Sequence, residues 1–265
     1  FEMLITGLDI EEKAKIVTDT FFNSVGGKDQ FDDVCVELVR TDKEDPQLNE
    51  EAFARLRVIV KSRNKDLVGR LFNAKMIEIA LANIPGFGPS NPIGDGTSFL
   101  AYWPALIDSS HITEYVHVDE EIIEVSPTSQ HGLSAVVADF EPATVSAAPS
   151  GDTVSIPFGR LFGTRSGDKG GCANLGVWAK NDEAYSFLHT FLTIERLKAL
   201  LPDTAEFEID RYELANIRSL NFFIKGILGE GVASSVRTDP QAKTLGEYLR
   251  AKTIDVPAIL AVQVK

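Results

Sequence analysis

The amino-acid sequence predicts an α+β protein with two domains, and three observations lead to this prediction. Short runs in which apolar and polar residues alternate, as in strands, are interspersed with longer runs of helical periodicity. In the first half these runs follow the order strand, helix, strand, strand, helix, strand, which is the ferredoxin-like βαββαβ pattern. A stretch rich in Ser, Ala, Pro and Thr, Ser126–Asp152, then precedes a second series of strands and helices.

The first domain is expected to form a four-stranded antiparallel sheet with two helices on one face. Asp9 and Glu12 have the spacing of a capping box, which marks the start of the first helix, and Gly26 marks its end. The long glycine-rich stretch Gly86–Thr97 is expected to be a loop. The predicted elements are strands at Phe1–Thr6, Phe31–Thr41, Phe53–Ser62 and Ser98–Ile107, helices at Ile10–Val25 and Leu67–Ile84, and extra strands at Ile112–Val118 and Glu121–Val125.

The second half alternates strands and helices and predicts a small α/β domain. Its expected strands are Thr153–Gly159, Ala173–Lys180, Phe207–Leu214 and Ala258–Val264, and its expected helices are Asp182–Leu201, Ile217–Leu228 and Thr244–Lys252. The predicted organisation is a first domain at 1–125, a linker at 126–152 and a second domain at 153–265.

Composition narrows the classes of function. The net charge of −13 argues against binding to nucleic acid or to an anionic membrane, which requires clustered Lys and Arg. The two cysteines, Cys35 and Cys172, match no metal-binding spacing, and His111 and His117 fit surface positions better than a metal site.

No membrane span or signal peptide is visible, so a cytoplasmic protein is expected, with the mitochondrion as the alternative. Because the chain starts at Phe1 inside a predicted strand, we expect a fragment or a processed product.

The segment Phe162–Trp178 places three charged side chains among closely spaced glycines, which can bring backbone N–H groups near a ligand. Arg165 and Lys169 would hold a phosphate or a carboxylate. Asp168 would act as a general base or would orient Lys169. The alternative interpretation of this segment is a tight hairpin with a solvated charge pair.

Several other residues are candidates for the same site. Gly167, Gly170 and Gly171 would supply N–H groups, and Ser166 would donate a hydrogen bond to the ligand. Polar residues within apolar stretches would complete the site, with capping and backbone hydrogen bonding as the alternative; they are Asn174, Arg218 and Asn221. The aromatic pair Tyr102-Trp103 would line a ligand pocket or pack at an edge.

The motif Arg165-Ser-Gly-Asp-Lys-Gly, followed by Asn174-Leu-Gly-Val177, resembles the AtuA-like family of acyclic terpene utilisation proteins, also catalogued as a domain of unknown function. The resemblance continues through Tyr212–Phe223, Gly229–Val232 and Lys243–Glu247. It implies that 1–125 is the last part of the main domain and that 153–265 is the small ferredoxin-like C-terminal domain. The resemblance also leads us to expect that the family's longer N-terminal half is missing from this sequence.

The resemblance implies a protein that handles branched acyl-CoA thioesters or related carboxylic acids in terpenoid or leucine-type catabolism, with CoA as part of the substrate and no separately bound cofactor. The N-terminal half of the same protein, a small-molecule ligand and further copies of the chain are the implied partners. The alternative is a non-catalytic interaction or assembly module of a larger AtuA or acyl-CoA carboxylase complex. The substrate and the reaction stay open.

Overall fold

The computed structural model describes residues 1–80, 84–90, 93–125 and 145–262. Its internal contacts divide the chain into two compact units, Phe1–Phe99 and Leu100–Lys265. Most of the expected linker, residues 126–144, lies outside the described residues. None of the helices within the described ranges is long and apolar enough to cross a membrane.

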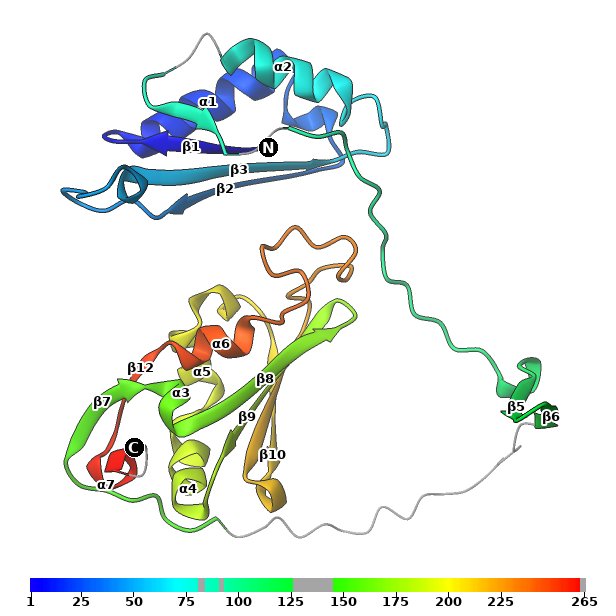
Figure 1. Ribbon diagram of the computed structural model, residues 1–265, viewed down its shortest axis with the longest axis vertical. Coiled ribbons are helices and arrows are strands. Elements are labelled where there is room, and N and C mark those ends of the chain that lie inside the picture. Colours follow the sequence, from blue (N-terminus) through cyan, green and yellow to red (C-terminus); the bar gives the residue numbers. More distant parts are fainter. Residues whose placement is uncertain (81–83, 91–92, 126–144, 263–265) are drawn as a thin grey trace. The chain divides into compact units, whose positions relative to one another are not determined.

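The first unit has the predicted ferredoxin-like topology. Its elements are β1 (Glu2–Thr6), α1 (Ile10–Ser24), β2 (Asp33–Arg40), β3 (Phe53–Lys61), α2 (Arg70–Ala80) and β4 (Phe87–Pro89), with short 3-10 turns at Lys28–Gln30 and Asn49–Ala52. The strands form one antiparallel sheet in the order β2-β3-β1-β4. Both helices lie over the same face of this sheet (Figure 1).

The core of the first unit explains why the helices lie on one face. Alternate residues of β1 and β3 are buried, and the apolar stripe of α1 packs against them. Phe21 is fully buried and makes edge-to-face contacts with the rings of Phe1 and Phe72. Two expectations are wrong here. The fourth strand is β4 and not Ser98–Ile107, because a short edge strand tolerates Gly and Pro. Asp9, the expected capping residue of α1, makes no side-chain capping bond.

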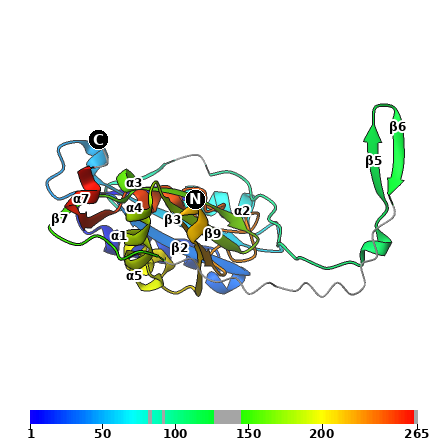
Figure 2. The same ribbon diagram turned by 90° about the horizontal axis from the view of Figure 1, so that it is seen from below.

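Residues 109–125 form a separate hairpin. A 3-10 turn at Ser109–His111 precedes β5 (Glu114–Val118) and β6 (Glu121–Val125), which pair with each other in antiparallel register. Figure 2 shows these two strands side by side. The two extra strands predicted from the sequence are therefore confirmed, and all ten of their residues are exposed.

The second unit is built around another four-stranded antiparallel sheet, in the order β10-β11-β9-β8, and a two-stranded sheet of β12 and β7. Its strands are β7 (Thr153–Pro157), β8 (Phe162–Lys169), β9 (Cys172–Ala179), β10 (Ile209–Leu214), β11 (Ser219–Ile224) and β12 (Thr253–Pro257). Its helices are α3 (Phe158–Leu161), α4 (Asp182–Phe191), α5 (Ile194–Leu200), α6 (Leu245–Arg250) and α7 (Ala258–Ala261), with 3-10 turns at Pro202–Thr204 and Ala215–Ile217.

Three elements of the second unit differ from the sequence prediction. The predicted helix Ile217–Leu228 is wrong, because β11 occupies its centre and buries Leu220, Phe222 and Ile224 with a period of two. The predicted helix Asp182–Leu201 is two helices, because Thr193 caps α5 by accepting a hydrogen bond from the N–H of Arg196. The closing strand is β12, and the start of the predicted strand Ala258–Val264 is helical.

Candidate functional site

The glycine-rich segment is an antiparallel hairpin of β8 and β9. Lys169 pairs with Cys172 across the two-residue turn Gly170-Gly171. Gly170 has a φ of 64°, and a Cβ on Gly171 would lie only 2.1 Å from the carbonyl oxygen of Gly229. Gly170 is therefore needed for the backbone conformation of the turn and Gly171 for its packing. Both needs are independent of any role in ligand binding.

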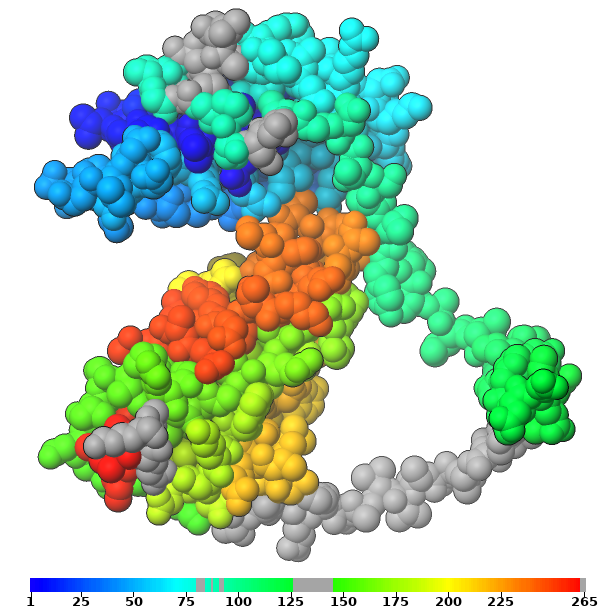
Figure 3. Space-filling model, viewed as in Figure 1, coloured from blue at the N-terminus to red at the C-terminus, as the bar shows by residue number. Residues whose placement is uncertain are grey.

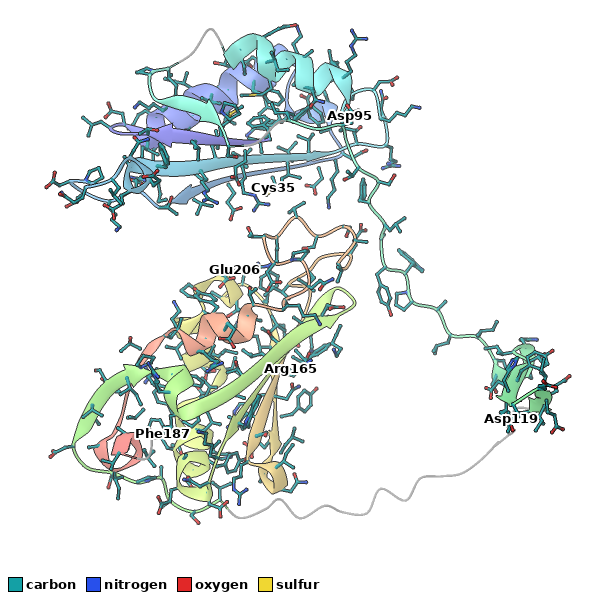
Figure 4. All side chains as sticks on the ribbon, in the orientation of Figure 1. Cys35, Asp95, Asp119, Arg165, Phe187 and Glu206 are labelled. Carbon is teal, nitrogen blue, oxygen red and sulfur yellow. The ribbon has the colours of Figure 1, made fainter. Side chains whose placement is uncertain are left out.

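The strand register sorts the candidate residues onto two faces of the sheet. Arg165 pairs with Gly176, which also pairs with Asn221, and Gly167 pairs with Asn174. These residues share the face opposite the helices, which we call the open face; Arg165 is labelled in Figure 4. The side-chain amide of Asn174 donates to the side-chain oxygen of Asn221 at 3.3 Å. Arg165, Asn174 and Asn221 therefore lie in neighbouring positions around glycines that have no side chain.

The opposite face of β8 packs against α6, which lies beside it (Figures 1 and 3). The backbone N–H of Gly246 donates to the Oγ of Ser166 at 2.9 Å. A Cβ on Gly246 would lie 2.7 Å from the Oγ1 of Thr164, which is buried without a hydrogen-bond partner among the described residues. Ser166 thus anchors α6 and does not share the open face with Arg165.

A small cavity lies between β8 and the start of α6. Its volume is about 260 Å³. The residues that line it come from two segments far apart in the sequence: Thr164, Arg165 and Ser166 from β8, and Lys243, Gly246 and Glu247 from the α6 region. Glu247 forms an ion pair with Arg250 at 2.9 Å. Two residues with cationic side chains, Arg165 and Lys243, therefore contribute to the lining of one cavity, which suits a carboxylate or phosphate oxygen.

Lys243 is the residue of this site that the sequence prediction missed. Its Nζ lies 3.7 Å from Oδ1 of Asp168, and a Cβ on Gly167 would lie 3.1 Å from the same nitrogen. The missing side chain at Gly167 thus leaves room for the ammonium group. Lys243 belongs to the motif Lys243–Glu247 noted above, but no sequence spacing links that motif to β8.

Asp239 holds the backbone from which Lys243 projects. Its carboxylate accepts hydrogen bonds from the N–H groups of Lys243 and Thr244 and from the Thr244 hydroxyl, at 2.8–2.9 Å. Partial burial alone would raise the pKa of Asp239, but these hydrogen bonds outweigh it and leave the pKa below its ordinary value. The carboxylate therefore stays ionised and keeps this turn in place.

The other candidates lie outside the cavity. The Nζ of Lys169 donates to the backbone oxygen of Asp168, so the carboxylate of Asp168 faces Lys243 and does not orient Lys169. Arg218 lies beside Ala179, at the end of β9 remote from the turn, and its Nε donates to Asp182 at 2.6 Å. The structure therefore does not bring Arg218 together with Arg165.

Tyr102 of the aromatic pair has structural partners, and so does His189 of α4. The N–H of Tyr102 donates to the oxygen of Glu230 at 2.7 Å, and the ring of Tyr102 lies against Gly170, whereas Trp103 is 87% exposed. His189 lies 2.9 Å from Glu213, and this hydrogen bond lowers the pKa of the Glu213 carboxyl. Within the described ranges, no group of three or more His, Cys, Asp or Glu side chains could hold a metal ion.

Comparison with known protein families finds two matched regions along the chain. Residues 1–118 match the acyclic terpene utilisation family protein AtuA. Residues 156–255 match the AtuA ferredoxin-like domain, which contains β8, β9 and α6. The chain has no significant match among curated proteins or solved structures. Because both matched regions lie in the order expected from the motifs, the chain belongs to the AtuA family.

Proposed function

We propose that this AtuA-family chain binds branched acyl-CoA thioesters or related carboxylic acids, and that the edge of β8 holds an anionic group of the ligand. CoA would enter as part of the substrate. The observation that carries the proposal is that Arg165 and Lys243, which are far apart in the sequence, both line the cavity between β8 and the start of α6. Arg165 makes no ion pair among the described residues, so its guanidinium is free to bind an oxyanion.

Each neighbouring group has a role in this proposal. Asp168 would keep the ammonium group of Lys243 over Gly167. Asn174 and Asn221 would contact the acyl or amide part of the ligand on the open face. Lys169 is exposed at the end of β8, where it would attract an anion from solution.

The test is calorimetric titration of the full chain with isovaleryl-CoA and with isovalerate. The double variant Arg165→Ala/Lys243→Ala should weaken binding of the ligand at least tenfold. The double variant Arg160→Ala/Lys180→Ala is the matched control, because it removes the same charge from exposed positions of the same unit outside the cavity. Equal affinity in the first variant and the wild type would contradict the proposal.

A second candidate function is that of an interaction or assembly module. The open face exposes Trp178, Tyr212 and Leu214, which are 42%, 50% and 40% accessible, and clustered exposed apolar side chains are typical of protein-binding surfaces. Light scattering separates the two functions. A Tyr212→Glu variant that dissociates an oligomer but retains affinity for the acid would favour the module.

A further inference from the structure

The first unit contains a large cavity that has no role in the proposed function. It lies where the chain leaves β3 and enters α2, and the segment Asp95–Phe99 forms its other wall. Its volume is about 940 Å³, within the range of cavities that hold cofactor-sized ligands. Asp95 is labelled in Figure 4. All lining residues belong to the first unit.

The cavity concentrates positive charge in an acidic chain. Arg63, Lys65 and Arg70 line it, against the two acids Asp66 and Asp95, while the whole chain carries −13. Arg63 lies 3.5 Å from Asp32, but Lys65 and Arg70 make no ion pair among the described residues. Both side chains are exposed and are free to bind an anion. This net positive charge suits one or two phosphate groups and is too small for a nucleic acid.

Apolar groups lie beside these cations. Val68, Leu71 and Phe99 line the same cavity, and Leu71 and Phe99 are 44% and 40% exposed. The Nζ of Lys61 lies 5.3 Å from the centroid of the Phe99 ring, a cation–π contact that favours this position of the ring. A bare phosphate would leave this apolar wall without contacts, whereas a ligand with a planar ring would use it.

Glycine shapes the cavity at the point where its two walls meet. A Cβ on Gly96 would lie 2.8 Å from the carbonyl oxygen of Val68 and 3.0 Å from its side chain. The segment Asp95–Phe99 can therefore lie directly on the Val68 backbone only because position 96 has no side chain. This close approach lets the segment that ends in Phe99 line the same cavity as Arg70.

We propose that this cavity binds a nucleoside diphosphate or a phosphate ester of the same class, with Lys65 and Arg70 on the phosphates and Phe99 against the ring. The lining residues of this cavity belong to the first unit and those of the β8 cavity to the second, so the inference goes beyond the proposed function. Inorganic phosphate and pyrophosphate would share the contacts with Lys65 and Arg70 but have no ring to lie against Phe99. Comparison of the probes therefore separates the two classes of ligand.

The experiment is calorimetric titration of the full chain with ADP, pyrophosphate and adenosine. ADP should bind the wild type, Arg70→Glu should weaken binding at least tenfold, and Phe99→Ala should weaken ADP but leave pyrophosphate unchanged. Lys75→Glu is the matched control: it makes the same charge change on the same helix, where Lys75 pairs with Glu78 outside the cavity lining, and it should change affinity less than twofold. Affinity should fall when NaCl rises from about 50 to 200 mM.

Three results would overturn the proposal: no ADP binding to the wild type, equal losses in Arg70→Glu and Lys75→Glu, or tight binding of pyrophosphate with no added contribution from the nucleoside. Circular dichroism checks the fold of each variant, and Lys65→Glu replaces Arg70→Glu if the latter fails to fold. The variant Arg165→Ala/Lys243→Ala should retain full ADP affinity, so failure of the β8 proposal and failure of this one are distinguishable.

Discussion

Replacement of Gly246 by alanine tests how α6 and Lys243 are positioned on β8. The new Cβ would lie 2.7 Å from the Oγ1 of Thr164 and 3.2 Å from its Cβ, whereas an ordinary contact is at least 3.4 Å. The helix or the strand must therefore move by about 0.7 Å, the difference between 3.4 and 2.7 Å. That shift lengthens the hydrogen bond from the Gly246 N–H to Ser166 from its present 2.9 Å.

The expected cost combines three effects. Overpacking costs about 2 kcal/mol, and the weakened hydrogen bond of a buried N–H costs about 1.5 kcal/mol. The higher helix propensity of alanine than of glycine stabilises the variant by about 1 kcal/mol and offsets part of this loss. The net loss in the free energy of unfolding is about 2.5 kcal/mol, which for a unit of this size lowers its Tm by about 5–10 °C. Displacement of α6 also moves Lys243, so binding of the acid should weaken in the same variant.

Urea unfolding followed by tryptophan fluorescence measures this effect selectively, because both tryptophans, Trp103 and Trp178, belong to the second unit. Thr164→Ala is the control, because it removes a buried oxygen that has no partner among the described residues and should cost under about 1 kcal/mol. The double variant should recover about 1–2 kcal/mol of the loss caused by Gly246→Ala. Additive losses, within about 0.5 kcal/mol, would refute the steric explanation.

Three further predictions follow from the second unit. Gly163→Ala should displace the ring of Trp178, which would lie 2.2 Å from the new Cβ, and fluorescence emission should shift to longer wavelength; an unchanged spectrum would contradict the contact. Gly171→Ala should destabilise the second unit by about 2 kcal/mol or more through its clash with the Gly229 oxygen, and an unchanged urea midpoint would count against this packing. Asp239→Asn should lower stability by about 1–2 kcal/mol at pH 7. Because the pKa of Asp239 is depressed in the folded protein, its contribution is fully present above the unfolded value of about 3.9 and is lost below it, so the two melting curves should converge as the pH falls towards 3.

Local sequence patterns were sufficient for most of the fold. The alternation in β1, β3 and β9 and the apolar stripe of α1 are properties of neighbouring residues, so the strands and helix were predictable without knowledge of their partners. The β5–β6 hairpin followed for the same reason. The strand β11 could not be predicted in this way, because its apolar residues fit a helical period as well as a period of two. Only its pairing with β9 and β10 decides between the two structures.

The candidate site, like the fold, was predictable from the sequence only in part. The sequence by itself determined that Arg165, Asp168 and the turn glycines lie close together, because they are adjacent along one hairpin. It could not determine that Asp168 faces Lys243 and that Ser166 anchors Gly246, because these partners lie in a segment distant along the chain. Strand alternation separates Arg165 from Ser166, and the packing of α6 on β8 brings Lys243 to Gly167. These are tertiary contacts, and a side chain's neighbours across a sheet or a helix interface leave no regular spacing in the sequence.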